Sequence, residues 1–268
     1  MTADPVPARL RAVEINLAYS ERRVVHGLSL DIPDGQVTVI VGANASGKST
    51  ALRALSRLLQ PQDGVVLLDG KSIAQRPSRE VARTLGLLPQ SPLAPEGVSV
   101  RDLAGRGRHP HQTWWRQWTV EDTIAVAEAL EATAMTELAD RDVDELSGGQ
   151  RQRAWIAMAV AQETDLLLLD EPTTYLDIAH QLDILELVAR LNRERGRTIV
   201  MVLHDLNLAS RYADHIVAMR DGRLVAEGPP SEVVTTEFLQ EVFHVEGTVM
   251  TDPATGTPVV LPLRTIGR

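Results

Sequence analysis

The nine residues from Gly42 to Thr50, which read Gly-Ala-Asn-Ala-Ser-Gly-Lys-Ser-Thr, constrain this chain more than any other segment. They fit the pattern G-x-x-x-x-G-K-[ST], in which backbone N–H groups and a lysine surround a phosphate. An apolar run of strand length precedes them at residues 36–41, and residues 51–59 continue at helical spacing. Free N–H groups and the helix dipole favour an anion at a helix N-terminus. The sequence therefore predicts a phosphate-binding loop between a buried strand and a helix.

Individual residues of this loop have separate expected roles. Lys48 should reach the β- and γ-phosphates of a nucleotide, and Ser49 should offer its hydroxyl to Mg²⁺. Of the 27 lysines and arginines only Lys48 and Lys71 are lysine, and a compact ammonium suits a phosphate cradle better than a guanidinium does. Ala45 stands where many such loops carry glycine, which adds strain of about 1 kcal/mol if the position needs a positive φ. The predicted phosphate-binding residues are Gly42, Asn44, Ala45, Ser46, Gly47, Lys48, Ser49 and Thr50.

The composition limits the class of protein. With 268 residues the chain can bury a full core, in one large domain or in one domain with a subdomain. The absence of cysteine excludes a disulfide framework, a thiolate metal site and a thiol nucleophile. No apolar run approaches the roughly 20 residues that span a bilayer, and residues 1–7 lack the regions of a signal peptide, so we expect a cytoplasmic protein. The net charge of −9 argues against broad nucleic-acid binding.

The segment that precedes the strand before the loop is expected to form an antiparallel β-layer. Residues 10–19 alternate apolar and polar side chains, and residues 24–25 and 28–32 are expected as two further short strands. Tyr19 is the only aromatic residue among the first 110, and it can either stack on a purine ring or simply pack at a strand end. A short strand at residues 85–88 ends just before Gln90, and the proline-rich residues after it form either a hinge or an ordinary loop.

Residues 98–145 differ from the rest of the chain. Helices are expected at residues 100–106 and from Thr119, whose Thr-x-x-acid pattern only loosely matches a capping box, to about Thr133. Between them, residues 106–118 mix basic and aromatic side chains. Such a segment can contact a protein partner, pack its tryptophans under a loop, or stack on nucleic acid.

A second candidate anion site opens another helix. Leu146 is followed by Ser147, Gly148, Gly149 and Gln150, and the helix is expected to continue through residue 160. A serine and two glycines before a helix leave N–H groups open to a phosphate. Ser147 as a plain N-cap is the alternative.

Two strands are expected to end in polar residues. Four consecutive leucines suit a strand buried on both faces, and it ends in Asp170 and Glu171. One carboxylate can organise Mg²⁺ and the other can activate water, and neighbouring strand residues should point to opposite faces; a helix-capping acid pair is the alternative. His204 follows a further strand at residues 198–203 and can hydrogen-bond a γ-phosphate or the attacking water, although a lone histidine is more often structural.

Strands and helices alternate around the loop, which predicts an α/β core with a mostly parallel sheet. The order of these motifs resembles the nucleotide-binding subunit of an ABC transporter, over essentially the whole chain. The resemblance implies an α/β P-loop NTPase (RecA-like) core at residues 1–90 and 146–250 with an antiparallel β-subdomain, an inserted helical subdomain at about 91–145 and a tail at about 251–268. It implies an ATPase that uses ATP and Mg²⁺. It assigns adenine stacking to Tyr19, Mg²⁺ binding to Ser49, Gln90 and Asp170, catalysis to Glu171, His204 and Gln90, and further nucleotide contacts to Asp177 and to Ser147, Gly148, Gly149 and Gln150.

Finer matches narrow the resemblance. Residues 171–177, Leu203-His204-Asp205-Leu206-Asn207 and the tail residues 252–258 look like the ATPases that serve iron–siderophore, vitamin B12 or haem import. That group implies a peripheral protein on the cytoplasmic face of the membrane, with permease subunits as partners and an extracytoplasmic substrate-binding protein as an indirect one. The sequence itself shows no siderophore site, and the chelate that is transported stays open.

The mechanism follows from geometry. A nucleotide held only by the loop at residues 42–50 has an exposed γ-phosphate. The helix start at Ser147 to Gln150 can cover that phosphate only from another chain. We therefore expect a head-to-tail dimer that sandwiches two ATP molecules, closes to drive the permease and reopens after hydrolysis. Arg108, Trp114 and Trp115 are predicted to contact the permease.

A soluble ABC ATPase that acts on DNA or ribosomes is the alternative class. Such proteins usually carry long coiled-coil insertions or two cassettes in one chain. This sequence has neither, and we expect no nucleic-acid partner.

Overall fold

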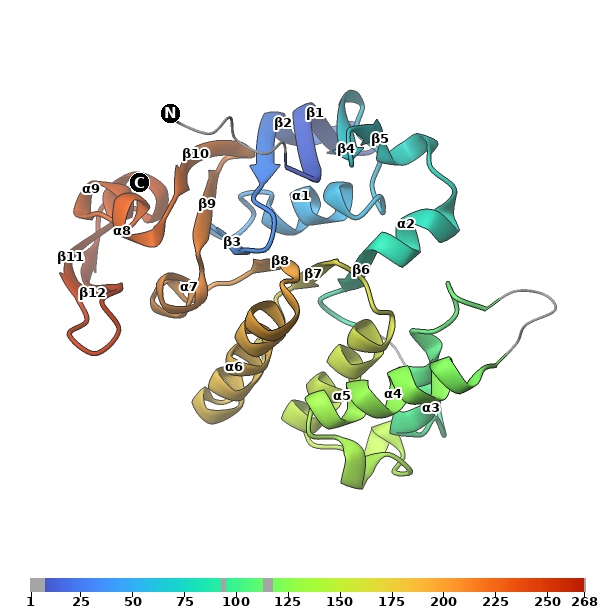
Figure 1. Cartoon of the computed structure of the whole chain (residues 1–268). Helices are drawn as coiled ribbons and strands as arrows, with labels where there is room; N and C mark the ends of the chain where they lie inside the picture. The colour runs from blue at the N-terminus through green and yellow to red at the C-terminus, as the bar shows by residue number, and fades with distance from the viewer. Residues whose placement is uncertain (1–7, 93–94, 113–117, 268) are drawn as a thin grey trace, which may run out of the picture. The chain divides into compact units, whose positions relative to one another are not determined.

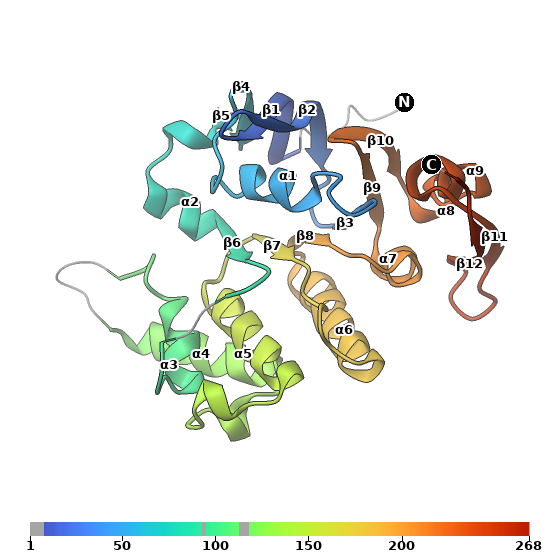
Figure 2. The ribbon, with the colours of Figure 1, turned by 180° about the vertical axis from the view of Figure 1, so that it is seen from behind.

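A computed structural model describes residues 8–92, 95–112 and 118–267 of the chain. By their internal contacts the residues form two compact units. The first unit is Met1–Arg76 with Val200–Arg268, and the second unit is Pro77–Ile199. Figure 1 and Figure 2 show the elements of both from opposite sides.

The first unit contains an antiparallel sheet in the order β2-β1-β4-β5. The strands are β1 (Leu10–Tyr19), β2 (Arg22–Ile32), β4 (Asp63–Leu68) and β5 (Lys71–Ser72). The prediction of two separate short strands at residues 24–25 and 28–32 is wrong, because both segments belong to the single strand β2. Its pairing with β1 has irregular register on either side of Gly27, whose φ is 56°, and Gly27 N–H donates to Asn16 Oδ1 at 3.0 Å. A bulge closed by a side chain thus keeps the ladder continuous.

The first unit also contains strands in the order β10-β9-β3-β8, of which β8 crosses the boundary between the units. β3 (Val37–Val41) pairs in parallel with β9 (His215–Arg220), and every residue of β3 is buried. A strand covered on both faces needs such a continuous apolar run, which the sequence indicated. The other elements are β8 (Thr198–Val202), β10 (Arg223–Gly228), α1 (Lys48–Leu55), η1 (Ile73–Gln75) and α7 (Leu206–Tyr212).

The helix after the phosphate-binding segment is shorter than expected. It ends at Leu55 rather than at residue 59, because Arg57 takes a left-handed conformation with a φ of 65°. The N–H groups of Leu58 and Leu59 both donate to Arg53 O, which satisfies a carbonyl of the last turn.

The C-terminal part of the first unit ends in a separate two-stranded sheet. It follows a series of short helices, the last two of which contact its first strand. These elements are α8 (Pro230–Val233), α9 (Thr236–Phe238), η4 (Leu239–Phe243), β11 (Val245–Thr251) and β12 (Pro258–Thr265).

The second unit is mainly helical around a parallel strand pair. β6 (Leu85–Leu88) pairs in parallel with β7 (Leu166–Asp170), in a register that sets Leu88 opposite Leu169. The helices are α2 (Ser78–Thr84), α3 (Val100–Arg106), α4 (Val120–Ala132), η2 (Thr136–Leu138), η3 (Val143–Glu145), α5 (Gly148–Ala161) and α6 (Ile178–Arg195). The helix predicted from Thr119 is confirmed, and its capping box with Asp122 is complete. Among the described residues, no helix combines the length and apolar character that a membrane span needs.

Candidate functional site

The phosphate-binding segment of the first unit has the predicted form of strand, loop and helix. β3 ends at Val41 and α1 begins at Lys48, with Gly47 as its N-cap at a φ of 98°. Within the part of the chain that the structure describes, no side chain caps this helix N-terminus. The N-terminal end of α1 and the helix dipole therefore suit an anion.

Lys48 and Ser46 are buried inside this loop. Lys48 Nζ donates to the carbonyls of Gly42 at 2.9 Å and Ala43 at 3.0 Å, so the ammonium is folded back over the loop. Ser46 is 3% exposed, and its Oγ has no hydrogen-bond partner among the described residues. A buried hydroxyl without a partner costs free energy unless a ligand satisfies it, which fits a loop built around phosphate oxygens.

The loop is held by β9 and by the turn between β9 and β10. Gly42 has a φ of 149°, and a Cβ there would lie 2.1 Å from Met219 O in β9, so only glycine fits. Gly222 N–H donates to Ser46 O at 3.0 Å, and Gly222 O accepts from His26 N–H at 2.8 Å. Asp221 and Gly222 form the turn between β9 and β10, and the sequence analysis did not foresee that this turn supports the phosphate loop.

Ala45 has a φ of 63°, which is the left-handed region. The position thus needs the positive φ that was considered from the sequence, and alanine there adds strain of about 1 kcal/mol. Its side chain is exposed, so the strain comes from the backbone rather than from packing.

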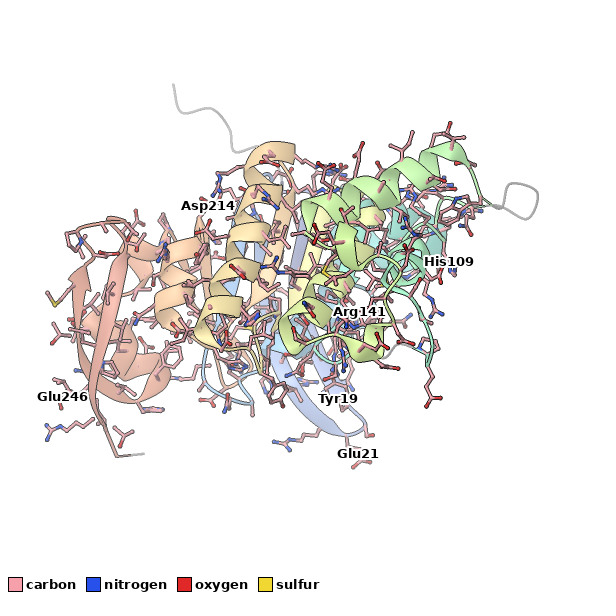
Figure 3. The ribbon with its side chains drawn as sticks, turned by 90° about the horizontal axis from the view of Figure 1, so that it is seen from below. Tyr19, Glu21, His109, Arg141, Asp214 and Glu246 are labelled. Carbon is pink, nitrogen blue, oxygen red and sulfur yellow. The ribbon has the colours of Figure 1, made fainter. Side chains whose placement is uncertain are left out.

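Tyr19 lies at the end of β1, and its ring is accessible. The residue is 43% exposed, and its hydroxyl accepts a hydrogen bond from Arg53 Nη1 of α1 at 3.1 Å. Figure 3 shows Tyr19 and Glu21 at the tip of the β1–β2 hairpin. The bond to Arg53 orients the ring while leaving it open to a flat partner.

His204 follows β8, the strand that neighbours β3 in the sheet. Leu203 N–H donates to Ile40 O at 3.3 Å, which brings the carboxyl ends of β8 and β3 together. His204 follows Leu203 directly and is exposed, and Gly42 follows β3 directly. The predicted placement of His204 beyond the carboxyl end of its strand is therefore observed, and its contact with a ligand stays a prediction.

Glu171 is positioned by two side chains of the second unit. Gln90 Nε2 donates to Glu171 Oε2 at 2.6 Å, and Thr174 Oγ1 donates to the same oxygen at 3.1 Å. The parallel register of β6 and β7 explains the first contact, because Gln90 and Glu171 each lie two residues beyond the paired Leu88 and Leu169. The role of Thr174 was not foreseen, since it depends on a turn that the sequence does not display.

The expectation that Asp170 and Glu171 point to opposite faces because they are neighbours in one strand is wrong. β7 ends at Asp170, which is 3% exposed, while Glu171 has a φ of 53° and lies outside the strand. Strand alternation therefore does not set the direction of the Glu171 side chain. The left-handed backbone does so, and strain of this kind in a non-glycine residue is common at functional sites.

The second helix N-terminus is satisfied by its own side chains. Ser147 Oγ accepts from Gln150 N–H at 3.3 Å, and Gln150 Oε1 accepts from Ser147 N–H at 3.1 Å, which completes a capping box. Gly149 is covered by His180, because a Cβ there would lie 2.2 Å from the His180 ring. His180 is in turn bonded to Asp177, the N-cap of α6.

Asp177 is fixed by hydrogen bonds rather than by burial. Its Oδ1 accepts from His180 N–H at 2.9 Å and lies 2.7 Å from His180 Nδ1. The N–H of His180 and then its ring hold the pKa of the Asp177 carboxyl below its ordinary value. A path of contacts thus links the predicted residues Asp177 and Gly149 within one chain, through a histidine that the sequence did not single out.

Arg108 is not available to a permease, so that prediction is wrong. It is 4% exposed and bonded to Asp122 Oδ1 at 2.9 Å, Glu163 Oε2 at 2.6 Å and Ala161 O at 2.6 Å. Burial acts to raise the pKa of Asp122, but hydrogen bonds from Arg108 and Thr119 hold it below its ordinary value. Arg108 therefore ties α4 to the end of α5. Trp114 and Trp115 lie outside the described residues.

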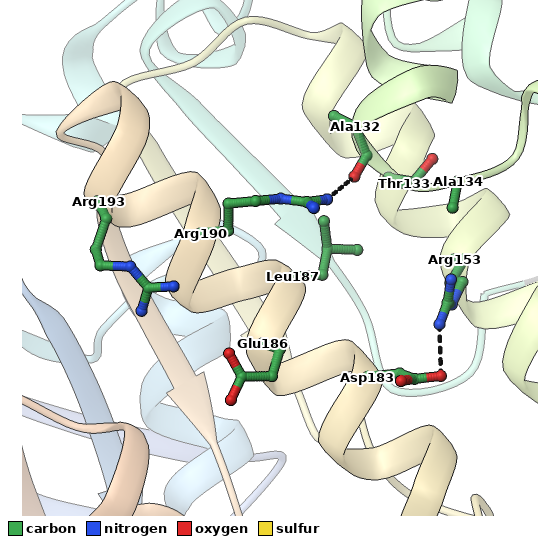
Figure 4. Close-up of a pocket in the computed structure, with 9 residues that line it drawn as sticks. All are labelled: Ala132, Thr133, Ala134, Arg153, Asp183, Glu186, Leu187, Arg190 and Arg193. Carbon is green, nitrogen blue, oxygen red and sulfur yellow. Dashed lines mark hydrogen bonds and ion pairs between the residues drawn. The ribbon is translucent and has the colours of Figure 1, made fainter.

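A hollow of about 280 Å³ in the second unit contains none of the predicted site residues (Figure 4). Arg190 donates to Ala132 O at the end of α4, and Arg153 pairs with Asp183 at 2.6 Å. These arginines bind a helix C-terminus and an acidic side chain, so the hollow is explained by packing of α4, α5 and α6. Its lining residues are Ala132, Thr133, Ala134, Arg153, Asp183, Glu186, Leu187, Arg190 and Arg193.

Each unit therefore contains residues that suit the binding or hydrolysis of a phosphate. The first unit joins an uncapped helix N-terminus, a buried lysine and a histidine, and the second joins a buried aspartate to a glutamate held by Gln90. These features define a P-loop NTPase.

Comparisons with known proteins agree with this class. Residues 25–174 match the ABC transporter family model. The chain is 55% identical over 92% of its length to the Bacillus subtilis protein "Probable siderophore transport system ATP-binding protein YusV", of which it covers 90%. It is 52% identical over 96% of its length to the Escherichia coli ferric enterobactin transport ATP-binding protein FepC, of which it covers 94%. The dimeric structure of a bacterial ABC transporter cassette matches 82% of this chain and 98% of its own, at 27% identity and a TM-score of 0.72.

The chain therefore belongs to the ABC transporter family, as one of its ATP-binding ATPase subunits. The predicted α/β P-loop fold is confirmed. The division into a core at residues 1–90 and 146–250 with a helical subdomain at 91–145 and a tail at 251–268 stays a prediction.

Proposed function

We propose that this protein hydrolyses ATP to energise the import of an iron(III)–siderophore or a related chelate across the cytoplasmic membrane. The observation that carries the proposal is the phosphate loop around buried Lys48, in a chain that aligns almost end to end with two siderophore transport ATPases. Residues 203–207 and 252–258 support the same group of importers.

The first unit supplies the contacts to the nucleotide itself. Lys48 exchanges its two loop carbonyls for the β- and γ-phosphates, and the open N–H groups of α1 bind the remaining phosphate oxygens. Ser46 Oγ gains the partner that it lacks among the described residues. Tyr19 stacks on the adenine with its hydroxyl held by Arg53, and His204 hydrogen-bonds the γ-phosphate.

Mg²⁺ fits the oxygen donors that are present. Asp170 is a buried carboxylate at a strand end, Gln90 carries an amide oxygen, and the hydroxyl of Ser49 lies in the first turn of α1. Hard cations of this size prefer such ligands. When bound, the ion neutralises charge on the β- and γ-phosphates.

Glu171 is the proposed base for the attacking water. Its carboxylate is held on one oxygen by Gln90 and Thr174, so its orientation is set before the reaction. Because Gln90 lies two residues beyond β6 and binds this base directly, a movement of the segment after β6 changes the position of the base. This makes Gln90 the residue through which permease contact can control hydrolysis.

A second copy of the chain is the proposed direct partner. Ser147, Gly148, Gly149 and Gln150 would cover the γ-phosphate on the partner subunit, in a head-to-tail dimer. Tyr175, two residues before Asp177, is 98% exposed and has a φ of 64°. An exposed aromatic side chain on a strained turn supports an interface at this segment.

Permease subunits at the cytoplasmic face of the membrane complete the assembly, with an extracytoplasmic substrate-binding protein as an indirect partner. Neither the charge of −9 nor any motif supports nucleic acid as a partner. Purification from detergent-solubilised membranes tests this choice, because permease subunits should accompany the protein. Recovery of nucleic acid or ribosomes instead would contradict the importer. Cells that lack the gene should also lose uptake of radiolabelled iron from the cognate siderophore.

Glu171→Gln gives the sharpest test of the site. The change keeps shape and hydrogen bonding but removes the base, so ATP hydrolysis should fall about 10²- to 10⁴-fold while ATP binding stays nearly intact. With binding retained and hydrolysis blocked, the variant should form an ATP-stabilised dimer in size-exclusion chromatography with light scattering. Wild type with ATP and Mg²⁺ should dimerise only transiently.

Glu128→Gln is the matched control, since Glu128 is exposed and forms an ion pair with Arg195 at 3.2 Å, away from the proposed site residues. It should behave as wild type. If the Glu171→Gln protein stays monomeric and hydrolyses ATP at the wild-type rate, Glu171 is not the base and the ATP-sandwiched dimer is contradicted.

A further inference from the structure

Two sequence segments that the catalytic residues do not account for meet in the first unit. These are the segment from His204 to Asn207 and the C-terminal hairpin of β11 and β12. Figure 1 and Figure 2 show α7 and β12 side by side from both directions. Asn207 Nδ2 donates to Val260 O at 3.2 Å, and Val260 N–H donates to Asn207 Oδ1 at 2.7 Å. The amide of Asn207 thus pairs with β12 as a residue of a neighbouring strand would.

The turn of the hairpin is fastened internally. Ala254 N–H donates to Asp252 Oδ1 at 3.0 Å, and Thr255 Oγ1 donates to Asp252 Oδ2 at 2.7 Å. These two hydrogen bonds, with the positive charge of Arg211 in α7, hold the pKa of Asp252 below its ordinary value. A fixed turn fixes the register of β12, so Val260 is presented to Asn207 at one defined position.

Helix α7, which carries Asn207, is also connected to His204. Asp205 caps α7, since its Oδ1 accepts from Leu208 N–H at 2.9 Å, and Leu203 is bonded to β3 through Ile40 O. His204 lies between these two anchors. A tilt of α7 therefore changes the backbone of His204, and Asn207 lies in the first turn of that helix.

We propose that Asn207 is a positioning residue for ATP hydrolysis, through which the C-terminal hairpin holds α7 and so sets the orientation of His204. The inference rests on the role proposed above for His204. An amide is needed, because the contact uses one donor and one acceptor of the same side chain. Aspartate keeps the acceptor and loses the donor, and alanine loses both.

Asn207→Ala tests the proposal in purified protein by ATPase kinetics. A small misplacement of a reacting group lowers turnover strongly, so we expect kcat to fall about tenfold while KM for ATP changes less than about twofold. Asn207→Asp should retain more activity than Asn207→Ala, because the bond from Val260 N–H survives. Arg264→Ala is the control, since it removes an exposed ion pair to Glu246 in the same hairpin and should leave kcat unchanged.

The decisive measurement repeats Asn207→Ala in a His204→Ala background. If Asn207 acts through His204, the residual turnover should fall less than about twofold further, because effects through one shared residue do not add. An equal loss in both backgrounds, or a wild-type kcat in Asn207→Ala and Asn207→Asp, overturns the inference. If His204→Ala alone keeps full turnover, the proposed role of His204 fails and the inference falls with it. A thermal melt of each variant identifies any that is unfolded, and Asn207→Asp then decides in place of Asn207→Ala.

Discussion

Helices α1 and α5 both begin after small residues that suit a phosphate, yet their first turns are satisfied differently. At α5 the side chains of Ser147 and Gln150 exchange hydrogen bonds with the backbone. At α1 the N-cap is Gly47, and within the described chain no side chain takes that part. The N-terminus of α5 is satisfied by its own side chains, whereas that of α1 is left for a ligand to complete.

This difference teaches how the two sites can be used in sequence. A phosphate that binds at α1 fills an open position, while one that binds at α5 must share or displace a cap with a value of about 1 kcal/mol. Nucleotide should therefore bind first to the P-loop of its own chain. The segment from Ser147 to Gln150 should then add its proposed contacts when a second subunit approaches.

Lys48→Ala is the change with the largest expected effect, because it removes the one charged side chain of the α1 site. A charge-assisted hydrogen bond contributes about 1.5–3 kcal/mol, so ATP affinity should fall roughly 10- to 100-fold and turnover should be abolished. Calorimetric titration with ATP and Mg²⁺ measures the affinity. Lys71→Ala, at the only other lysine, is the control and should match wild type. Unchanged affinity and turnover in Lys48→Ala would sink the P-loop assignment.

Ser147→Ala should separate the cap at α5 from its proposed role toward the partner subunit. Loss of the cap lowers the free energy of unfolding by about 1 kcal/mol. Monomer affinity for ATP should not change, because the phosphate contacts of the monomer come from α1, but turnover and ATP-dependent dimerisation should fall.

Ser99→Ala is the matched control for that change. Ser99 caps α3 by accepting from Asp102 N–H at 3.1 Å, and it has no proposed contact with nucleotide. It should lower the melting temperature to a similar degree and leave turnover unchanged. If Ser147→Ala lowers stability and spares turnover in the same way, Ser147 is only a cap.

The sequence predicted those features whose signals are local. The phosphate-binding loop from Gly42 to Thr50 could be predicted because three signals follow one another in the sequence: an apolar strand, a glycine-containing motif and a segment with helical spacing. The two strand ends at Asp170 and His204 followed in the same way, since an apolar run marks where each strand stops. The assignment of nucleotide-contact roles to these residues stays a proposal.

Contacts between distant residues were not predictable from the sequence. Gly222 supports Ser46 across 176 positions, and no pattern in either segment indicates it. Arg108 lies in a basic and aromatic segment whose composition is typical of an exposed surface. Its side chain is nevertheless buried, because Asp122 and Glu163 neutralise its charge. The direction of Glu171 depends on one left-handed backbone conformation, which its residue type does not favour.

Ala45→Gly has the smallest expected effect and tests whether the open site at α1 carries backbone strain. Glycine relieves about 1 kcal/mol at a φ of 63° but gives back about 0.4–1 kcal/mol through greater freedom of the unfolded chain. The variant should therefore be equal to wild type or up to about 0.6 kcal/mol more stable, which raises the melting temperature by about 1–2 °C at most. Ala43→Gly in the same loop is the control, since Ala43 is not among the described residues with positive φ, and it should lose stability. ATP affinity should be unchanged in Ala45→Gly, because its N–H group remains in place. An equal loss of stability in both variants, measured by thermal denaturation without nucleotide, would show that position 45 is unstrained.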